Sequence, residues 1–559
     1  MRLTSVLVVA LGVAAVVVCG GLGCGGSSGV PDGGFVPDLV CPGSSECPGD
    51  PAGPFEVGYA QADITPDLAA RDTYTDENGD GQWQESEPWT DVDGDGVFNP
   101  VFVAGFGSAR VATAVHDPLW SRALVIRSRG LTVAIAVLDL VGLFYDEVLK
   151  IRAQVKAQRP DLDLVLVMTT HNHEGPDTLG IWGPDQHESG VYLAYNAMVG
   201  QRCAESIVAA AAALQPAVAT FAGIDVEDAG GDLTPYVDDS RAPTVINPRL
   251  TVLDFAAAGG GARIATLVNW SNHPEALGGD NTAITSDFPH YLRTGMEEGF
   301  TRQGTTYAGT GAPVIYVNGA VGGLMTTLHT RPIADDGTPV PAAQQESFAA
   351  AAAIGHGVAA FALRALGPGG GAVLEAAPDL AFRTISFVAP LDNTALHVAY
   401  FFGIFDRALY EYDPRSPIDV GNLPHIRTEI DYVTFGPASI ITVPGELFPE
   451  LFLGGYDGSY RGTYALIEPD NPNPPDLAAA PPPPYLRDLM AGEHRMVFGL
   501  ANDEIGYIVP AYDFKLDPLV PYLEQAPGDH YEEIVSLGER VEDSIVGTAR
   551  KLIEYQSGR

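Results

Sequence analysis

Basic residues are scarce in this 559-residue chain. Lysine and arginine together number 30, against 71 aspartates and glutamates, which gives a formal net charge of −41. A surface this acidic repels phosphate backbones, so the sequence argues against a nucleic-acid partner. The same surplus of carboxylates favours the binding of divalent cations.

Cysteine is also scarce, with five in the chain. Cys41 and Cys47 are close enough for a small disulfide, which an oxidising compartment would preserve. Cys203 lies in an apolar helical stretch and is interpreted as a small buried hydrophobic residue. We find no long apolar run after residue 24 and therefore expect no membrane span in the mature chain.

The N-terminus has the features of an export signal. One early positive charge precedes the apolar run Val6–Val18, which is too short for a confident membrane span. The segment Gly21–Cys24 resembles a bacterial lipobox, in which the signal is cut before a cysteine that becomes diacylated. A plain secretory signal or a short anchor helix is the alternative. We predict a signal peptide over 1–23 and an exported, membrane-anchored bacterial lipoprotein, periplasmic or at the cell surface, held only by the lipid on Cys24.

The rest of the chain divides into a tether and one large domain. Residues 24–52 are rich in Gly, Ser and Pro, as linkers are. Residues 53–559 contain β-branched runs that alternate with helical stretches, which predicts a mixed-sheet, layered α/β domain. The expected strands lie within 112–142 and at 162–168, 262–270, 313–317, 381–388, 429–435 and 438–443, and the expected helices are 146–158, 192–214, 346–366 and 534–555.

An acidic insert at 72–100 contains two loops that match calcium-binding patterns. Residues 76–87 fit the twelve-residue EF-hand loop, with Gly81 at its sixth position. A second loop repeats the start of this pattern but has Phe102 at its twelfth position. A solvated acidic loop is the alternative to a structural Ca²⁺ site. The expected calcium ligands are Asp76, Asn78, Asp80, Gln82, Glu87, Asp91, Asp93 and Asp95.

Four short motifs carry candidate metal ligands. His171 and His173 are two residues apart at the end of a strand, so side-chain alternation puts both imidazoles on one face. His273 ends another strand, within Asn269–Pro274. The third motif is Pro444–Glu446 and the fourth is Gly499–Tyr507. Each is weak alone, because a strand-end histidine is usually a satisfied polar residue and Pro-Gly-Glu is usually a turn.

Taken in order, the four motifs resemble the neutral/alkaline (non-lysosomal) ceramidases, which hydrolyse the amide of N-acylsphingosines. Thr170–Pro176 is similar to the family's T-H-T-H-S-G-P, and Asn269–His273 fits N-W-x-x-H. The family's P-G-E and G-L-x-N-x-x-x-x-Y segments match the other two motifs. Ala104–Gly107 and His116–Ala123 also resemble the family's opening, so the resemblance covers residues 57–540.

The resemblance implies a Zn²⁺ ion held by His171, His273, Glu446 and Tyr507, a set of nitrogen and oxygen ligands that suits zinc. A zinc-activated water would attack an acyl carbon. His173 would lie beside that water or the substrate carbonyl and protonate the leaving group, and either His173 or Arg241 would steady the oxyanion. From its place at a strand end, Asp139 is interpreted either as a hydrogen-bond partner of a histidine or as a cap of the strand.

The chain departs from the family where the family has a serine that has been regarded as catalytic. Gly323 stands at that position in the segment Asn318–Met325. Either Thr326 or Thr327 replaces the serine, or no side-chain nucleophile is needed. The substitution leaves the substrate open. The family's C-terminal immunoglobulin-like module also has no counterpart in the residues after Tyr507.

The leading hypothesis is a zinc-dependent hydrolase of amide or ester bonds in N-acyl lipids or related small molecules. One alternative is a calcium-binding surface lipoprotein that keeps the hydrolase fold without catalysis. Another is a metal-dependent phosphoesterase, which would need a second set of Asp and His ligands that the sequence does not offer.

Overall fold

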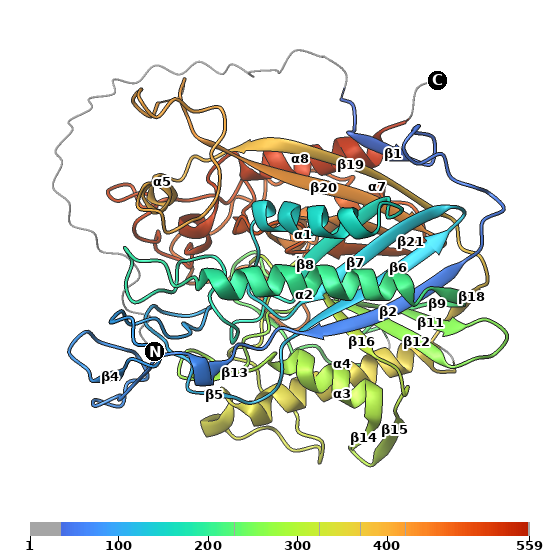
Figure 1. Ribbon diagram of the computed structural model, residues 1–559, viewed down its shortest axis with the longest axis horizontal. Coiled ribbons are helices and arrows are strands. Elements are labelled where there is room, and N and C mark those ends of the chain that lie inside the picture. The colour runs from blue at the N-terminus through green and yellow to red at the C-terminus, as the bar shows by residue number, and fades with distance from the viewer. Residues whose placement is uncertain (1–34, 229, 324, 369, 420, 557–559) are drawn as a thin grey trace.

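Two β-sheets stacked face to face form the centre of the protein (Figure 1). The computed structural model describes residues 35–556, except 229, 324, 369 and 420. The predicted signal peptide and Cys24 therefore lie outside the described residues. Side chains from both sheets, such as Phe255 and Phe435, share one hydrophobic core. Alternation along the strands turns every second side chain toward this core and the others toward covering helices.

The larger sheet has nine strands and is mixed, as predicted. Neighbouring strands are antiparallel except for the pairs β7–β8 and β12–β16, which are parallel. In spatial order the strands are β16 (Val314–Asn318), β12 (Arg263–Trp270), β11 (Arg249–Ala257), β9 (Gln215–Asp225), β2 (Glu56–Asp63), β6 (Trp120–Ser128), β7 (Leu131–Leu138) and β8 (Leu164–Thr169), with β18 (Val373–Glu375) also paired to β9.

The smaller sheet has five strands and closes the other side of the core. Only its pair β21–β23 is parallel. Its spatial order is β1 (Leu39–Cys41), β19 (Leu380–Pro390), β20 (His425–Phe435), β21 (Ala438–Thr442) and β23 (His494–Phe498).

Helices cover the outer faces of both sheets, which gives an α/β/β/α sandwich. On the larger sheet, α1 (Tyr145–Gln158) and α2 (Leu193–Ala212) cover one half, and α3 (Phe288–Glu298) and α4 (Phe348–Leu366) cover the other. On the smaller sheet, α8 (Val541–Glu554) buries its apolar stripe against β19 and β20 (Figure 1). In the described part of the chain, α4 alone is long and apolar enough to cross a membrane, and most of it is buried inside this fold.

The remaining elements are short and lie in the connections. They are the strand pairs β3 (Thr73–Tyr74) with β4 (Trp89–Thr90), β5 (Ala114–Val115) with β13 (Ala283–Ile284), β10 (Asp238–Asp239) with β17 (Met325–Thr326), β14 (Gly299–Arg302) with β15 (Thr305–Ala308), and β22 (Glu446–Leu447) with β24 (Tyr507–Ile508), and the helices η1 (Leu68–Ala70), η2 (Ala342–Gln344), α5 (Thr394–Phe401), α6 (Pro449–Leu453), α7 (Leu486–Leu489) and η3 (Glu532–Val535).

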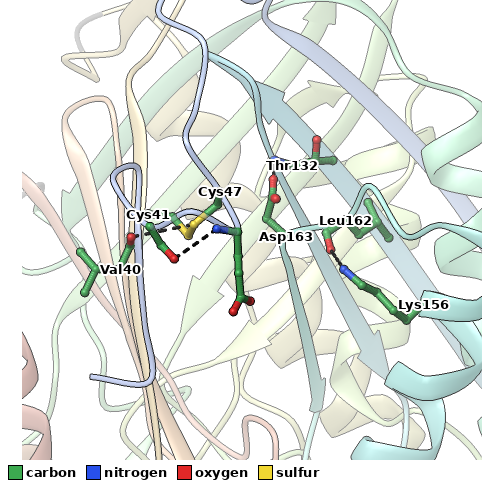
Figure 2. The surroundings of a disulfide bond; sticks show 9 residues. Val40, Cys41, Cys47, Thr132, Lys156, Leu162 and Asp163 are labelled. Carbon is green, nitrogen blue, oxygen red and sulfur yellow. Dashed lines mark hydrogen bonds between the residues drawn. A yellow bond between two sulfur atoms is a disulfide. The ribbon is translucent and has the colours of Figure 1, made fainter. Parts of the chain in front are cut away.

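The predicted tether over 24–52 needs a correction, because its described part belongs to the body of the protein. β1 pairs with β19 at the edge of the smaller sheet. The predicted disulfide Cys41–Cys47 is formed, and both half-cystines are buried in the central core. Figure 2 shows this bridge near the starts of β7 and β8, where Thr132 and Asp163 lie. Strand pairing and burial of the disulfide fix a segment whose composition resembles that of a linker.

The acidic insert is a hairpin held by its own small aromatic core. β3 and β4 flank the first acidic loop as antiparallel strands, so the loop has strands where an EF-hand has helices. Phe98 packs against Trp83 and Trp89, with ring centroids 4.5 and 5.4 Å apart, and against Phe102 at 6.5 Å. These rings attach the insert to the segment that leads to β5.

Candidate metal centre

Two edges of the curled nine-stranded sheet meet at the candidate centre. His171 follows β8 and His273 follows β12, near opposite edges of the sheet, yet β16 next to β12 approaches β8. Asn318, at the end of β16, joins the two histidine loops. Its side-chain amide donates to the Thr170 carbonyl at 3.1 Å and its Oδ1 accepts from the Asn272 N–H at 3.1 Å.

Both histidines are oriented by backbone carbonyls. His171 Nδ1 lies 2.7 Å from the Val141 carbonyl oxygen, and His273 Nδ1 lies 2.7 Å from the Met325 carbonyl oxygen. His171 also has a φ of 63°, a left-handed conformation that is costly for a residue with a side chain. With Nδ1–H committed to a carbonyl, each ring turns its Nε2 lone pair to the centre, as metal-binding histidines do.

Glu446 and Tyr507 approach from a separate pair of strands. β22 and β24 run parallel with Glu446 and Tyr507 as partners in register. Glu446 Oε2 lies 2.9 Å from His273 Nε2 and 3.4 Å from His171 Nε2. The Tyr507 hydroxyl is 2.5 Å from the hydroxyl of Tyr531, a residue that the sequence motifs did not select. The structure thus brings all four sequence-predicted zinc ligands together.

His273 and Glu446 form a buried charged pair at this centre. Burial alone would lower the pKa of His273, but the hydrogen bond to Glu446 and the charges of Glu275 and Glu446 raise it to about 9. Burial opposes ionisation of Glu446, yet the charges and hydrogen bonds of His171 and His273 lower its pKa to about 2. Burial and the Glu446 charge raise the pKa of Tyr507 well above its usual value. A bound metal ion would take the place of the proton that the apposed nitrogen and carboxylate atoms otherwise share, so the donor set fits Zn²⁺.

His173 lies against the same centre. One possible ligand atom from each of His171, His173 and His273 lies within 4.8 Å of the others, so these three could also hold a metal ion. The His173 ring is buried edge-on to Phe106, with centroids 5.3 Å apart. Burial, together with His171, His273 and Arg110 nearby, lowers the pKa of His173 well below its usual value. His173 is therefore a neutral imidazole at physiological pH.

Arg241 lies behind this centre rather than among the histidines. Its guanidinium makes ion pairs with Asp513 at 3.1 Å, Glu532 at 2.7 Å and Glu533 at 2.9 Å, and lies 3.0 Å from His530 Nδ1. Glu532 follows Tyr531, so this buried cluster is adjacent to the Tyr507–Tyr531 pair. The contacts of Arg241 are those of a structural cation, and its predicted role at the carbonyl stays a prediction.

Asp139 takes the second of its two expected roles. Both carboxylate oxygens bind the Arg293 guanidinium, at 2.7 and 3.0 Å, and one also accepts the Trp120 N–H at 2.9 Å. It therefore fastens the end of β7 to β6 and α3. The backbone carbonyls of Val141 and Met325 supply the histidine contacts that Asp139 was one candidate to make.

Two buried threonines directly follow the segment in which the family serine is missing. A Cβ on Gly323 would lie 3.2 Å from Asp239 Oδ1, so this position faces Asp239 rather than an open space. The Thr326 hydroxyl donates a short hydrogen bond to Glu275. The Thr327 hydroxyl lies 3.5 Å from the His273 carbonyl oxygen.

Buried carboxylates around the histidines were missed by sequence reasoning. Glu174 pairs with Arg110 at 3.3 Å, and burial raises its pKa well above the usual value. Burial also raises the pKa of Asp287 to about 7. Glu275 faces His173, and burial together with the Glu446 charge raises the pKa of Glu504 well above its usual value. Glu174 and Glu275 each follow within two residues of a histidine in a motif. This adjacency in sequence could have identified both as candidate site residues.

The two acidic loops repeat one geometry. The first aspartate of each loop, Asp76 or Asp91, accepts two backbone N–H groups at 2.6 and 2.9 Å. The predicted bidentate ligand Glu87 is buried and accepts the N–H groups of Glu77 and Gln84. Asp72, a residue not predicted from sequence, joins Asp91 and Asp93 in a group that could hold a cation.

Structural comparison with known proteins identifies the fold, whereas sequence comparison finds no match. No protein-family model matches the chain, and no curated protein matches its sequence. Among solved structures, neutral ceramidase from Pseudomonas aeruginosa superimposes with a TM-score of 0.58 at 16% identity, over 89% of this chain and 74% of that one. A ceramidase complexed with C2 gives a TM-score of 0.55 at 16% identity, over 89% and 75%. The chain therefore has the ceramidase fold, and the predicted α/β class is confirmed.

Proposed function

We propose that this protein is a zinc-dependent amidohydrolase that cleaves amide bonds, or the related esters, in N-acyl lipids or similar small molecules. One observation carries the proposal. His171, His273, Glu446 and Tyr507, which lie up to 336 positions apart in the sequence, converge with two imidazole Nε2 atoms and a carboxylate in direct apposition. A metal ion bound there would replace the proton that these buried groups otherwise share.

The chemistry follows from the residues that surround the centre. A zinc ion held there would act as a Lewis acid and bring the pKa of a water toward about 7. His173 is neutral and has an Nε2 without a hydrogen-bond partner among the described residues, so it can accept a proton from the attacking water. It would then donate that proton to the leaving nitrogen as the C–N bond breaks. Neither Thr326 nor Thr327 is needed as a nucleophile in this scheme.

A lipid substrate is the substrate class that we favour. Two solved structures with this fold are a neutral ceramidase and a ceramidase complexed with C2, which supports an N-acyl substrate. Gly323 in place of the family serine leaves the amine half of that substrate open. We also propose that lipidation of Cys24 anchors the exported protein at a membrane. The buried Cys41–Cys47 disulfide fits such an oxidising location, and Cys24→Ser should release the protein from the membrane fraction.

We further propose that the insert binds structural Ca²⁺. The two loops repeat the same aspartate-to-backbone contacts, and Asp72 adds a buried carboxylate to the second loop. A hairpin held by a few aromatic rings would gain stability from a cation that bridges its carboxylates. The expected ligands remain those of the sequence prediction, with Asp72 added.

The test of the enzyme proposal is an assay of zinc-loaded protein against a panel of N-acyl amides and esters of varied head group and chain length. We expect hydrolysis of at least one member by the wild type. His171→Ala should reduce that activity at least 1000-fold, while His187→Ala, which changes a largely exposed histidine in a loop, should not. Equal activity in His171→Ala and wild type would refute the site. A protein that holds zinc and cleaves no member would favour the non-catalytic alternative.

A further inference from the structure

Glu275 is a buried carboxylate that the sequence motifs did not select. It lies two residues after His273, and its backbone N–H donates to the His273 carbonyl at 3.1 Å, so both residues belong to one tight turn. Its side chain is only 7% exposed. Among the described residues it makes no ion pair with lysine or arginine, and its closest ionisable contact is His173. His273, Glu174 and Asp287 also lie within range of its charge.

The two oxygens of Glu275 have different partners. Oε1 accepts the hydroxyl of Thr326, which comes from β17. Oε2 lies 3.5 Å from His173 Nδ1. Among the carboxylate oxygens of the described residues, Oε2 is the one that faces this nitrogen in an ion-pair contact. The Thr326 hydroxyl thus orients the carboxylate, and the carboxylate faces one specific nitrogen of the imidazole.

His173 has little freedom to turn away from this contact. A Cβ on Gly105, whose φ is +100°, would lie 2.3 Å from the His173 Cβ, so that backbone passes directly over the histidine. The Arg110 guanidinium donates to the His173 carbonyl at 2.6 Å, and the His173 N–H donates to the Pro274 carbonyl at 3.1 Å. Within the described part of the chain, Nδ1 has no hydrogen-bond partner, and Glu275 Oε2 is the carboxylate oxygen that faces it at 3.5 Å.

We propose that Glu275, held by Thr326, is a positioning residue that keeps a proton on His173 Nδ1 and so keeps the Nε2 lone pair directed at the reaction centre. The catalytic consequence rests on the proposed hydrolase function. His173 Nε2 takes a proton from the attacking water and gives it to the leaving nitrogen when the C–N bond breaks. Glu275 keeps its contact with Nδ1–H throughout and takes up no proton in this step.

This arrangement assigns a role to Thr326. Its hydroxyl proton is already donated to Glu275, so it supports a carboxylate instead of attacking the substrate. A carboxylate, an imidazole and a reacting water then form an ordered series of the kind in which the carboxylate selects the imidazole tautomer. Replacing an acid of this kind typically reduces activity 10- to 100-fold.

The test combines kinetics on the full-length protein with ¹⁵N NMR of histidine-labelled protein, in which His173→Gln assigns the signals. Glu275→Gln should lower kcat 10- to 100-fold with KM and zinc content within twofold of wild type, and Glu275→Asp should recover part of the loss. The NMR spectrum should show Nδ1–H at His173 in wild type and loss of that preference in Glu275→Ala. Glu298→Gln, on the exposed end of α3, is the matched control.

Thr326 supplies a second pair of variants in case the Glu275 variants do not fold. Thr326→Val should lower kcat by several-fold, and Thr326→Ser should retain more activity than Thr326→Val. Loss of all activity in Thr326→Val with unchanged tautomer would make Thr326 a nucleophile and overturn the inference. Zinc loss in parallel with kcat in Glu275→Gln would make Glu275 a ligand and also overturn it. If wild type cleaves no substrate, the proposed function fails, and the His173 tautomer still decides the positioning role.

Discussion

Glu446 and Tyr507 stand opposite each other as register partners on the short parallel strands β22 and β24. This pairing sets the tyrosine oxygen on the same side of the centre as the carboxylate that contacts His171 and His273. Two residues 61 positions apart in the sequence are thereby held at one place by backbone hydrogen bonds. The relative positions of these two proposed ligands are consequently set by the strands that carry them.

The two neighbouring tyrosines offer a direct test of the ligand assignment. Tyr507→Phe and Tyr531→Phe each remove one partner of the same hydroxyl–hydroxyl hydrogen bond. Only Tyr507→Phe removes a proposed ligand oxygen. We expect zinc affinity, measured by competition with a chromogenic chelator, to fall at least tenfold more in Tyr507→Phe than in Tyr531→Phe. Equal losses in the two variants would exclude Tyr507 as a ligand.

Asn318 should contribute both to the free energy of unfolding and to the affinity for zinc. Its side chain joins the loops of His171 and His273, so Asn318→Ala leaves buried polar groups unpaired and frees both loops. We expect the free energy of unfolding in urea to fall by about 1–3 kcal/mol, together with a loss of zinc affinity. Asn422→Ala removes similar contacts from a distant surface loop and is the control. An unchanged zinc affinity in Asn318→Ala would show that the two loops hold their positions without it.

Glu450 should make stability fall as pH rises. Burial, with the charge of Asp513 nearby, raises the pKa of Glu450 to about 8, against 4.5 for the ordinary group. Between these values the folded state binds a proton that the unfolded state has lost, so ΔG of unfolding decreases from about pH 4.5 to pH 8. Glu450→Gln removes this contribution. We expect the Tm of Glu450→Gln to rise relative to wild type by several degrees between pH 5 and pH 8. A constant difference across that range would contradict the assignment.

Calcium should stabilise the protein through the acidic insert. Adding Ca²⁺ to metal-free wild type should raise Tm in a concentration-dependent way, because a ligand that binds only the folded state stabilises it by mass action. Asp80→Ala should abolish the part of this shift that the first loop provides. Asp457→Ala, in another exposed acidic turn, should keep the full shift. If Asp80→Ala and Asp457→Ala respond to Ca²⁺ alike, the first loop does not bind calcium.

Much of the fold could be predicted from local sequence patterns. The strands and helices with strong periodicity are present, among them β7, β8, α1, α2 and α4. The expected helix over 534–555 begins only at Val541, because Glu532–Val535 form a separate 3₁₀ turn. The strands β9 and β11 and the short helix α3 were not predicted. Their identity depends on sheet neighbours that are distant in sequence, which local propensity does not report.

The sequence motifs predicted the four proposed ligands but not the contacts that bring them together. Each proposed ligand stands in a short motif at a strand end, so the four positions could be selected together. Their convergence depends on the curl of the larger sheet and on Asn318, which no single motif encodes. Tyr531 and Glu275 acquire their roles from contacts between distant segments. Arg241, selected by a looser match, lies in a salt-bridge cluster that local sequence could not reveal.

The most direct experiment on the proposed zinc centre is calorimetric titration of metal-free protein with Zn²⁺. We expect one tightly bound ion per chain, with proton release from the centre on binding. Binding should be lost in His273→Ala and unchanged in His187→Ala. Absence of tight binding in wild type, or wild-type binding in His273→Ala, would contradict the claim that His171, His273, Glu446 and Tyr507 form a zinc centre.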